Sequence, residues 1–235
     1  MKICLRHLLA PSLGLVLLAA CSSDPAGSKA NANNTKDSGA PPGEDASLPP
    51  TGPVDLPFLL SDEFAPSGYM GDSKTDYLAI QMSKDATDCK SPRSTDAAGD
   101  CYTVAWKPVM LPDQKTAWVG VYWQYPANNW GATTGRDVAS GAQKVSFYAA
   151  GAKGGEVLKF QVGGMNTLPG GDPTLTNKDS FTATADVTLT TEWARYEVPL
   201  KDANYDSVIG GFAWTATVSS DAEVKFYVDD VRWQE

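Results

Sequence analysis

The chain has 235 residues, of which 20% are charged, and its formal net charge is −9. An acidic surface makes nucleic acid and anionic lipid headgroups poor partners, because phosphates require a basic surface. A neutral ligand, or a cation such as calcium, suits this charge balance better.

Residues 1–20 have the pattern of an export signal. Lys2 and Arg6 precede an almost wholly apolar run from Leu8 to Ala20, which is too short to span a membrane. The run ends in Leu-Ala-Ala-Cys21, which resembles the lipobox of bacterial lipoproteins. That resemblance implies cleavage before Cys21 and attachment of lipid to Cys21. The alternative is ordinary secretion, which leaves Cys21 without a role.

The residue after the cysteine bears on location. In lipoproteins of this kind, a serine such as Ser22 favours the outer membrane over the inner one. The sequence therefore predicts a protein of the cell envelope, held by its lipid anchor and either periplasmic or surface-exposed.

Cleavage there also removes Cys4 and His7, the only histidine of the chain. A mature chain without histidine excludes Ser-His and Cys-His nucleophile pairs and histidine-ligated metals. Cys89 and Cys101 remain, and in an oxidising compartment this pair predicts a disulfide.

Residues 21–55 are predicted to be the lipidated cysteine followed by a disordered linker. Between residues 22 and 53 there is one leucine and no aromatic residue, so the segment has too little apolar surface to order itself. Residues 56–235 are long enough for one sizeable core.

Short alternating segments separated by Gly, Pro, Asn and Asp predict strands throughout that domain, and no segment shows a capped helical stripe. This pattern is typical of an antiparallel β-sandwich or barrel. The predicted strands are Tyr77–Ser83, Thr103–Trp106, Ala117–Tyr125, Gln143–Gly151, Glu156–Val162, Phe181–Leu189, Trp193–Pro199, Val208–Thr217 and Glu223–Trp233.

The stretch WVGVYWQYPANNWG (118–131) carries the strongest indication of a ligand site. Its alternation places Tyr122 and Gln124 on one face of a strand and Trp123 on the other, which we assign to the core. A loop with Asn128, Asn129 and Trp130 follows. Rings that stack on sugar C–H groups, beside amides that bond hydroxyls, suit a carbohydrate. The polar faces of two further strands add Tyr148, Lys159 and Gln161. These residues either line one shallow groove with Tyr122 and Gln124 or are ordinary solvent-exposed surface.

The segments KFYVDDVRW (225–233), LTTEWARYEVPL (189–200) and GGFAWTA (210–216) resemble the galactose-binding-like jelly rolls that many carbohydrate-binding modules use. SDEFAPSGYMGD (61–72) and VYWQYPANNWG (121–131) are similar to a less characterised extracellular bacterial subgroup. The resemblance covers most of residues 56–235 and implies an all-β antiparallel sandwich that binds a glycan or polysaccharide without catalysis.

In those modules a structural calcium is often held between the first and last strands. The matching acids here are Asp62 or Glu63 and Asp229 or Asp230. The alternative is that Asp229 and Asp230 form a solvated strand end.

Two other functions stay open. One is a jelly-roll hydrolase or lyase: Glu192 and Glu197 lack the aromatic frame of a glycosidase, and a lyase would use Tyr148 with Lys159 or Arg195. The other is a structural or adhesive surface protein that binds another protein.

Overall fold

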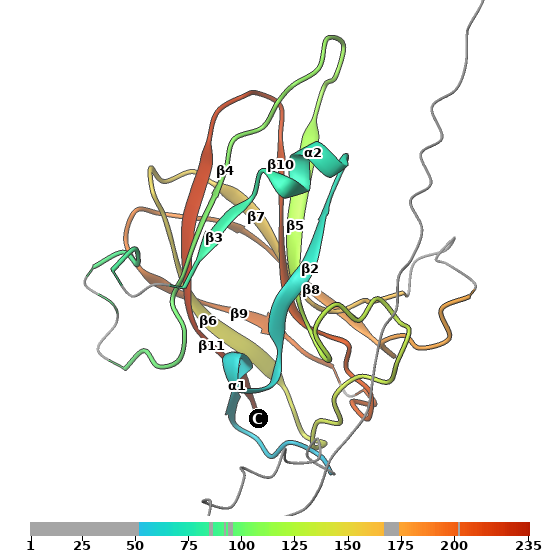
Figure 1. Cartoon of the computed structure of the whole chain (residues 1–235). Coiled ribbons are helices and arrows are strands. Elements are labelled where there is room, and N and C mark those ends of the chain that lie inside the picture. Colours follow the sequence, from blue (N-terminus) through green and yellow to red (C-terminus); the bar gives the residue numbers. More distant parts are fainter. Residues whose placement is uncertain (1–51, 85–86, 92, 94–95, 167–173, 202) are drawn as a thin grey trace, which may run out of the picture. The chain divides into compact units, whose positions relative to one another are not determined.

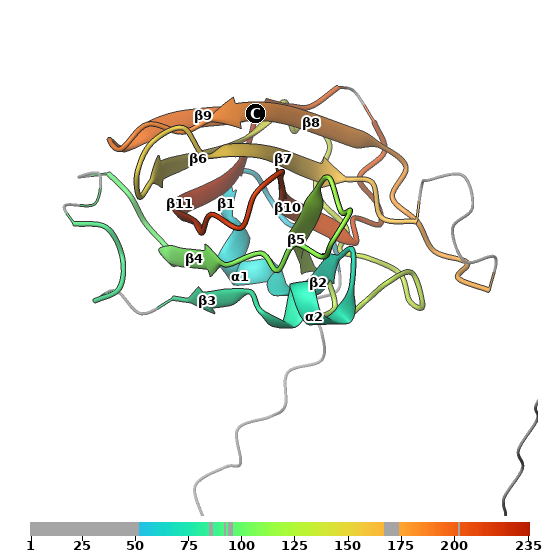
Figure 2. The ribbon, with the colours of Figure 1, turned by 90° about the horizontal axis from the view of Figure 1, so that it is seen from above.

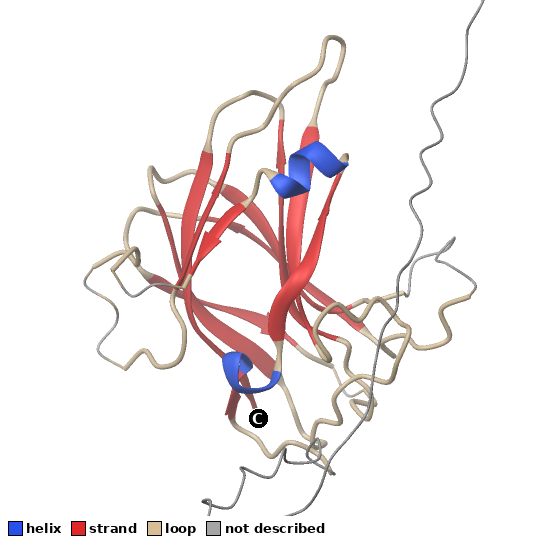
Figure 3. Ribbon diagram, in the orientation of Figure 1, coloured by secondary structure: helices blue, strands red, loops and turns tan. Residues whose placement is uncertain are grey.

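The computed structural model describes residues 52–84, 87–91, 93, 96–166, 174–201 and 203–235. The predicted signal peptide, Cys21 and nearly all of the predicted linker lie outside these residues. Strands dominate the described part, and its helices α1 (Leu60–Glu63) and α2 (Lys74–Leu78) are short (Figures 1 and 3). The strands are β1 (Phe58–Leu59), β2 (Ala65–Gly71), β3 (Gln81–Ser83), β4 (Tyr102–Trp106), β5 (Ala117–Gln124), β6 (Lys144–Gly151), β7 (Val157–Gly163), β8 (Thr182–Thr188), β9 (Ala194–Pro199), β10 (Gly210–Val218) and β11 (Val224–Gln234).

The strands form two antiparallel sheets, which Figure 2 shows as two layers that face each other. One sheet has the order β3-β4-β11-β6-β9, with β1 added to β11, and the other has the order β2-β5-β10-β7-β8. From β4 onward, β4-β11-β6-β9 pack against β5-β10-β7-β8, which is the arrangement of an eight-stranded jelly roll. The predicted all-β antiparallel sandwich is therefore confirmed.

The core between the sheets follows from the alternation along each strand. In β5, Val119, Val121 and Trp123 point inward and are fully buried. The Trp123 ring meets the rings of Tyr102 and Phe212 edge-on, with centroids 5.1 and 5.6 Å away. Trp123 thus belongs to the core, as its place on the strand predicts.

The prediction of a strand over residues 77–83 was wrong in its first half. Ser73 caps α2 by accepting a hydrogen bond from the Asp76 N–H at 3.2 Å, and the helix runs through Tyr77 to Leu78. Only Gln81–Ser83 pair as a strand. No helix among the described residues is long and apolar enough to cross a bilayer.

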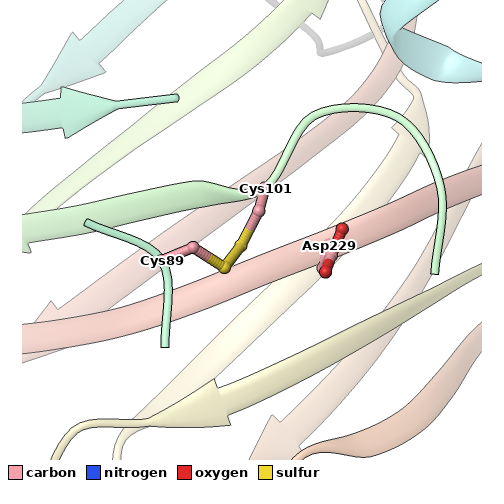
Figure 4. Close-up of side chains that lie close together, drawn as sticks. All are labelled: Cys89, Cys101 and Asp229. Atoms are coloured by element: carbon pink, nitrogen blue, oxygen red, sulfur yellow. A yellow bond between two sulfur atoms is a disulfide. The ribbon is translucent and has the colours of Figure 1, made fainter. Parts of the chain in front are cut away.

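The predicted disulfide between Cys89 and Cys101 is confirmed, and it ties a loop to the six-stranded sheet (Figure 4). Arg93 in this loop binds the buried carboxylate of Asp229 on β11 through two hydrogen bonds of 2.6 and 2.7 Å. Tyr148 donates a hydrogen bond to Asp96 of the same loop at 3.1 Å. Because Tyr148 and Asp229 are cross-strand partners, both anchors lie on one face of this sheet, the face turned away from the core.

Candidate functional site

The outer face of the five-stranded sheet carries a groove. On β5, Trp118, Gly120 and Tyr122 alternate with the inward residues and so face away from the core. The groove has a volume of about 450 Å³. Its lining comprises Met70, Trp118, Tyr122, Trp130, Gln161, Gly164, Met165, Asn166, Leu175, Thr182 and Thr215.

Gly120 lets the side chains of Met70 and Thr215 pack closely over the middle of β5. A Cβ atom at this position would lie 2.8 Å from the Met70 and Thr215 side chains and 2.6 Å from the Trp214 carbonyl oxygen. The neighbouring side chains therefore occupy the space that any larger residue at position 120 would need. As a result Met70 packs between the levels of Trp118 and Tyr122.

Tyr122 and Gln161 form the hydrogen-bonded floor. The Tyr122 hydroxyl donates to the Gly163 carbonyl at 3.2 Å, and Gln161 Nε2 donates to the Tyr122 hydroxyl and, at 3.0 Å, to the same carbonyl. Burial raises the pKa of Tyr122 above its ordinary value, so the hydroxyl stays protonated. Gly163 and Gly164 both have positive φ, 68° and 88°, which lets the chain turn tightly over Gln161.

A buried carboxylate lies behind this floor. Asp179 is 1% exposed and accepts hydrogen bonds from three backbone N–H groups, those of Met165, Ile209 and Gly210, at 2.8, 2.6 and 3.3 Å. It therefore joins the Met165 rim to the start of β10. Burial raises the pKa of Asp179 to about 6, and the three backbone hydrogen bonds oppose that rise.

Trp130 stands at the other rim, and the residue is 38% exposed. Asn129 holds its loop: Nδ2 donates to the carbonyls of Tyr125 and Thr133 at 3.1 and 2.9 Å, and Oδ1 accepts from the N–H groups of Gly131 and Thr133. The Gly131 carbonyl in turn accepts from the Asn177 N–H at 3.1 Å, which fixes Trp130 against the segment that carries Leu175.

Gln124, Asn128 and Asn129, which we predicted to touch ligand, lie behind the groove instead of lining it. Gln124 is fully buried and bonds the Asn129 carbonyl at 2.9 Å and Ser67 Oγ at 2.9 Å. The Asn128 N–H donates to Ser67 Oγ at 2.8 Å. The side chains of Gln124 and Asn129 and the backbone of Asn128 hold the turn that presents Trp130.

The structure separates the other two predicted residues. Lys159 lies on the same face of β7 as Gln161 but beyond the groove, and its Nζ is 3.9 Å from Asp186. Tyr148 belongs to the six-stranded sheet, so it does not share a groove with Tyr122. The pairing of Tyr148 with Lys159 that a lyase would need is absent for the same reason, whereas Tyr148 and Arg195 are cross-strand neighbours.

The acids predicted to hold calcium mostly have arginine partners. Glu63 binds Arg136 at 2.7 Å, Asp229 binds Arg93, and Asp230 binds Arg232 at 2.6 Å, while Asp62 is exposed. Calcium at these positions would have to displace guanidinium groups. Calcium stays a prediction, and melting curves with and without EDTA test it. The cysteine sulfurs near Asp229 are bonded to each other and offer no thiolate.

Several groove residues were missing from the prediction. Trp118 had a usable signal, because it lies four residues before Tyr122 on the same face of one strand. Met70, Met165, Asn166 and Leu175 reach the groove from β2 and from loops. Their neighbourhood depends on the tertiary fold, and no local pattern marks them.

No family model matches the sequence, and neither does any curated protein. The chain is similar to several solved structures, among them the family 30 carbohydrate-binding module of cellulosomal cellulase Cel9D-Cel44B of Clostridium thermocellum. The two share 13% identity, the match covers 77% of this chain and 98% of that one, and the TM-score is 0.45. The family 11 module of Lic26A-Cel5E of Clostridium thermocellum is similar at 13% identity, with 77% and 95% coverage and a TM-score of 0.41. TmCBM61, in complex with β-1,4-galactotriose, is similar at 17% identity, with 74% and 91% coverage and a TM-score of 0.37.

Proposed function

We propose that the domain is a non-catalytic carbohydrate-binding module that holds a glycan in the groove over β5. The observation that carries the proposal is the groove itself, in which Trp118, Tyr122 and Trp130 offer ring surface beside the amides of Gln161 and Asn166. Ring faces bind the C–H faces of sugars by excluding water, and amides orient hydroxyls. The described lining contains no carboxylate, and a glycosidase of the usual kind needs two.

We further propose that Cys21 carries lipid and that the linker connects the domain to the outer membrane. This proposal rests on the Leu-Ala-Ala-Cys sequence after an apolar run. The protein would then hold polysaccharide at the cell envelope, in the periplasm or on the cell surface.

The binding proposal is tested with the lipid-free chain from Ser22 onward and a panel of soluble polysaccharides in affinity electrophoresis and titration calorimetry. Trp118→Ala and Trp130→Ala are each expected to weaken binding at least about tenfold, since a stacked ring contributes roughly 1.5 kcal/mol or more of buried apolar surface. Trp193→Ala is the matched control, because Trp193 contacts Tyr227 and the Lys90 carbonyl beside the other sheet. Binding that survives both groove variants would contradict the proposal.

A further inference from the structure

The lining of the groove restricts the charge of its ligand. Among the described lining residues there is no Asp, Glu, Lys or Arg. The nearest cation on the same face of β7, Lys159, lies beside Asp186, which offsets its charge. A carboxylated or sulfated sugar entering this apolar groove would lose water without gaining a counter-charge, which is unfavourable. The groove therefore suits a neutral sugar.

The two lining amides are oriented by their partners. Asn166 Nδ2 donates to the carbonyls of Leu175 and Asn177 at 3.0 and 3.2 Å, and Gln161 Nε2 donates to the Gly163 carbonyl. A carbonyl only accepts, so each amide must turn its N–H₂ group towards the protein. The oxygens, Asn166 Oδ1 and Gln161 Oε1, accept no hydrogen bond from any described residue. Neither oxygen is among the fully buried polar side-chain atoms that lack a hydrogen-bond partner in the described part of the chain. The groove therefore presents acceptors to an O–H or N–H of the ligand.

Apart from the hydroxyls of Thr182 and Thr215, the rest of the lining is apolar, and it is not flat. Met70 and Met165 pack around Tyr122 in a small cluster separate from the main core, and Leu175 lies across the groove beside Gly131. A flat sugar face stacks on rings, but its hydroxyl edge would lose water against these aliphatic and thioether groups without finding a partner. A methyl group is the natural complement, and thioether chains adapt closely to its shape.

From these three features we infer that the groove selects a neutral glycan whose sugars bear acetyl groups. This inference rests on the proposed carbohydrate-binding function and specifies its ligand. The acetyl methyl packs against Met70, Met165 and Leu175. The oxygens of Gln161 and Asn166 accept from a sugar hydroxyl or from the N–H of an acetamido group. Both O-acetylated and N-acetylated glycans contain this chemistry.

Two neutral pairs of ligands test the inference by calorimetry on the lipid-free chain. One pair is hexa-N-acetylchitohexaose and cellohexaose, which differ in acetamido against hydroxyl at each C2. The other is acetylated xylan and the same polymer after mild alkaline deacetylation. At least one acetylated ligand is expected to bind about tenfold tighter than its partner, a ratio equivalent to roughly 1.4 kcal/mol. The pair that responds distinguishes the N-acetyl from the O-acetyl source.

Variants locate the preference. Met70→Gln keeps the length of the side chain and replaces the thioether by an amide, so it should reduce the ratio between acetylated and unacetylated ligand towards one. Leu78→Gln is the control, since Leu78 is exposed on α2 and does not line the groove. An unchanged melting temperature shows that each variant folds. Equal or weaker binding of both acetylated ligands, while other neutral glycans bind, would overturn the inference and leave the proposed function standing. Failure of the entire polysaccharide panel would overturn both.

Discussion

At the scale of single residues, two tryptophans seven positions apart have opposite roles. Trp123 is fully buried between the sheets, whereas Trp130 is 38% exposed at the groove rim. The difference follows from their settings, since Trp123 is on the inward face of a central strand and Trp130 follows the turn at Pro126 and Asn128.

Trp123→Ala is therefore expected to destabilise the domain by about 3–5 kcal/mol through loss of buried surface and creation of a cavity. Trp130→Ala should leave the unfolding free energy within about 1 kcal/mol of wild type while weakening glycan binding at least about tenfold. Urea unfolding and calorimetry on both variants measure the two effects. A reversed pattern would mean that the rim and core assignments are exchanged.

Asp179 predicts an unusual pH dependence of stability. Its pKa in the folded protein is about 6, above the unfolded value of about 3.9. The folded state therefore binds more protons than the unfolded state between these values. The stabilisation that protonation gives is complete below about pH 4, falls as pH rises through about 6, and amounts to roughly 3 kcal/mol.

Other carboxylates also titrate in this range, so the measurement is a difference. The unfolding free energy of wild type minus that of Asp179→Asn is expected to decrease by roughly 2 kcal/mol between pH 4 and pH 7 and then to level off. Urea unfolding curves measured at steps of one pH unit are sufficient. A difference that does not change with pH would show that the three backbone N–H groups fully offset the cost of burying the charge.

At the scale of elements, alternation predicted most of the strands. The observed bounds of β5, β6, β7, β9 and β11 lie within one residue of the predicted ones, because residues that pack in the core alternate along each strand with residues that face outward. The segment Ala65–Gly71 was not predicted as a strand, since APSGYMG contains a proline and two glycines and shows no alternation. It pairs with β5 at the sheet edge, where proline is tolerated.

The candidate site was predicted in part, for a similar reason. Tyr122, Trp130 and Gln161 were identified from one aromatic stretch and one polar strand face, and all three line the groove. Strand alternation cannot show that residues 165, 166 and 175 approach that face, because loops bring them there. Alternation also cannot show that Tyr148 belongs to the opposite sheet. It tells which side of a strand a residue is on, but not which of the two sheets contains that strand.

The disulfide loop gives a prediction at the same scale. Asp229 is 1% exposed and Arg93, with a side chain 32% exposed, is its guanidinium partner. Arg93→Ala should cost roughly 2 kcal/mol of stability, because it leaves a buried carboxylate with an unpaired charge. Arg195→Ala, on an exposed arginine that bonds Ser146 Oγ at 3.1 Å, is the control and should change stability by about 0.5 kcal/mol or less. Adding Asp229→Asn to Arg93→Ala should recover part of the loss, and no recovery would contradict the ion-pair explanation.

At the scale of the whole molecule, the two sheets separate two tasks. The groove lies on the outer face of the five-stranded sheet, and the loop closed by Cys89 and Cys101 lies on the outer face of the six-stranded sheet. The buried core separates the two, so events at one outer face reach the other only through the stability of the sandwich. Arg93→Ala should accordingly leave glycan affinity unchanged at temperatures where the variant is folded.

The same separation of tasks extends to the membrane anchor. If Cys21 is the lipidated residue, Cys21→Ser in the full-length protein should abolish incorporation of labelled fatty acid and move the protein from the membrane fraction to the soluble fraction. The physical reason is that the remaining chain has a net negative charge, which anionic lipid headgroups repel. Cys4→Ser is the matched control, because it removes a cysteine from the same N-terminal region and should leave lipidation intact. The released protein should bind glycan with wild-type affinity, since the described residues that line the groove all lie at or after Met70. Acyl labelling that persists in Cys21→Ser, or is lost in Cys4→Ser, would refute the assignment of Cys21. Lost glycan binding in a folded, released protein would instead show that the anchor segment contributes to the site.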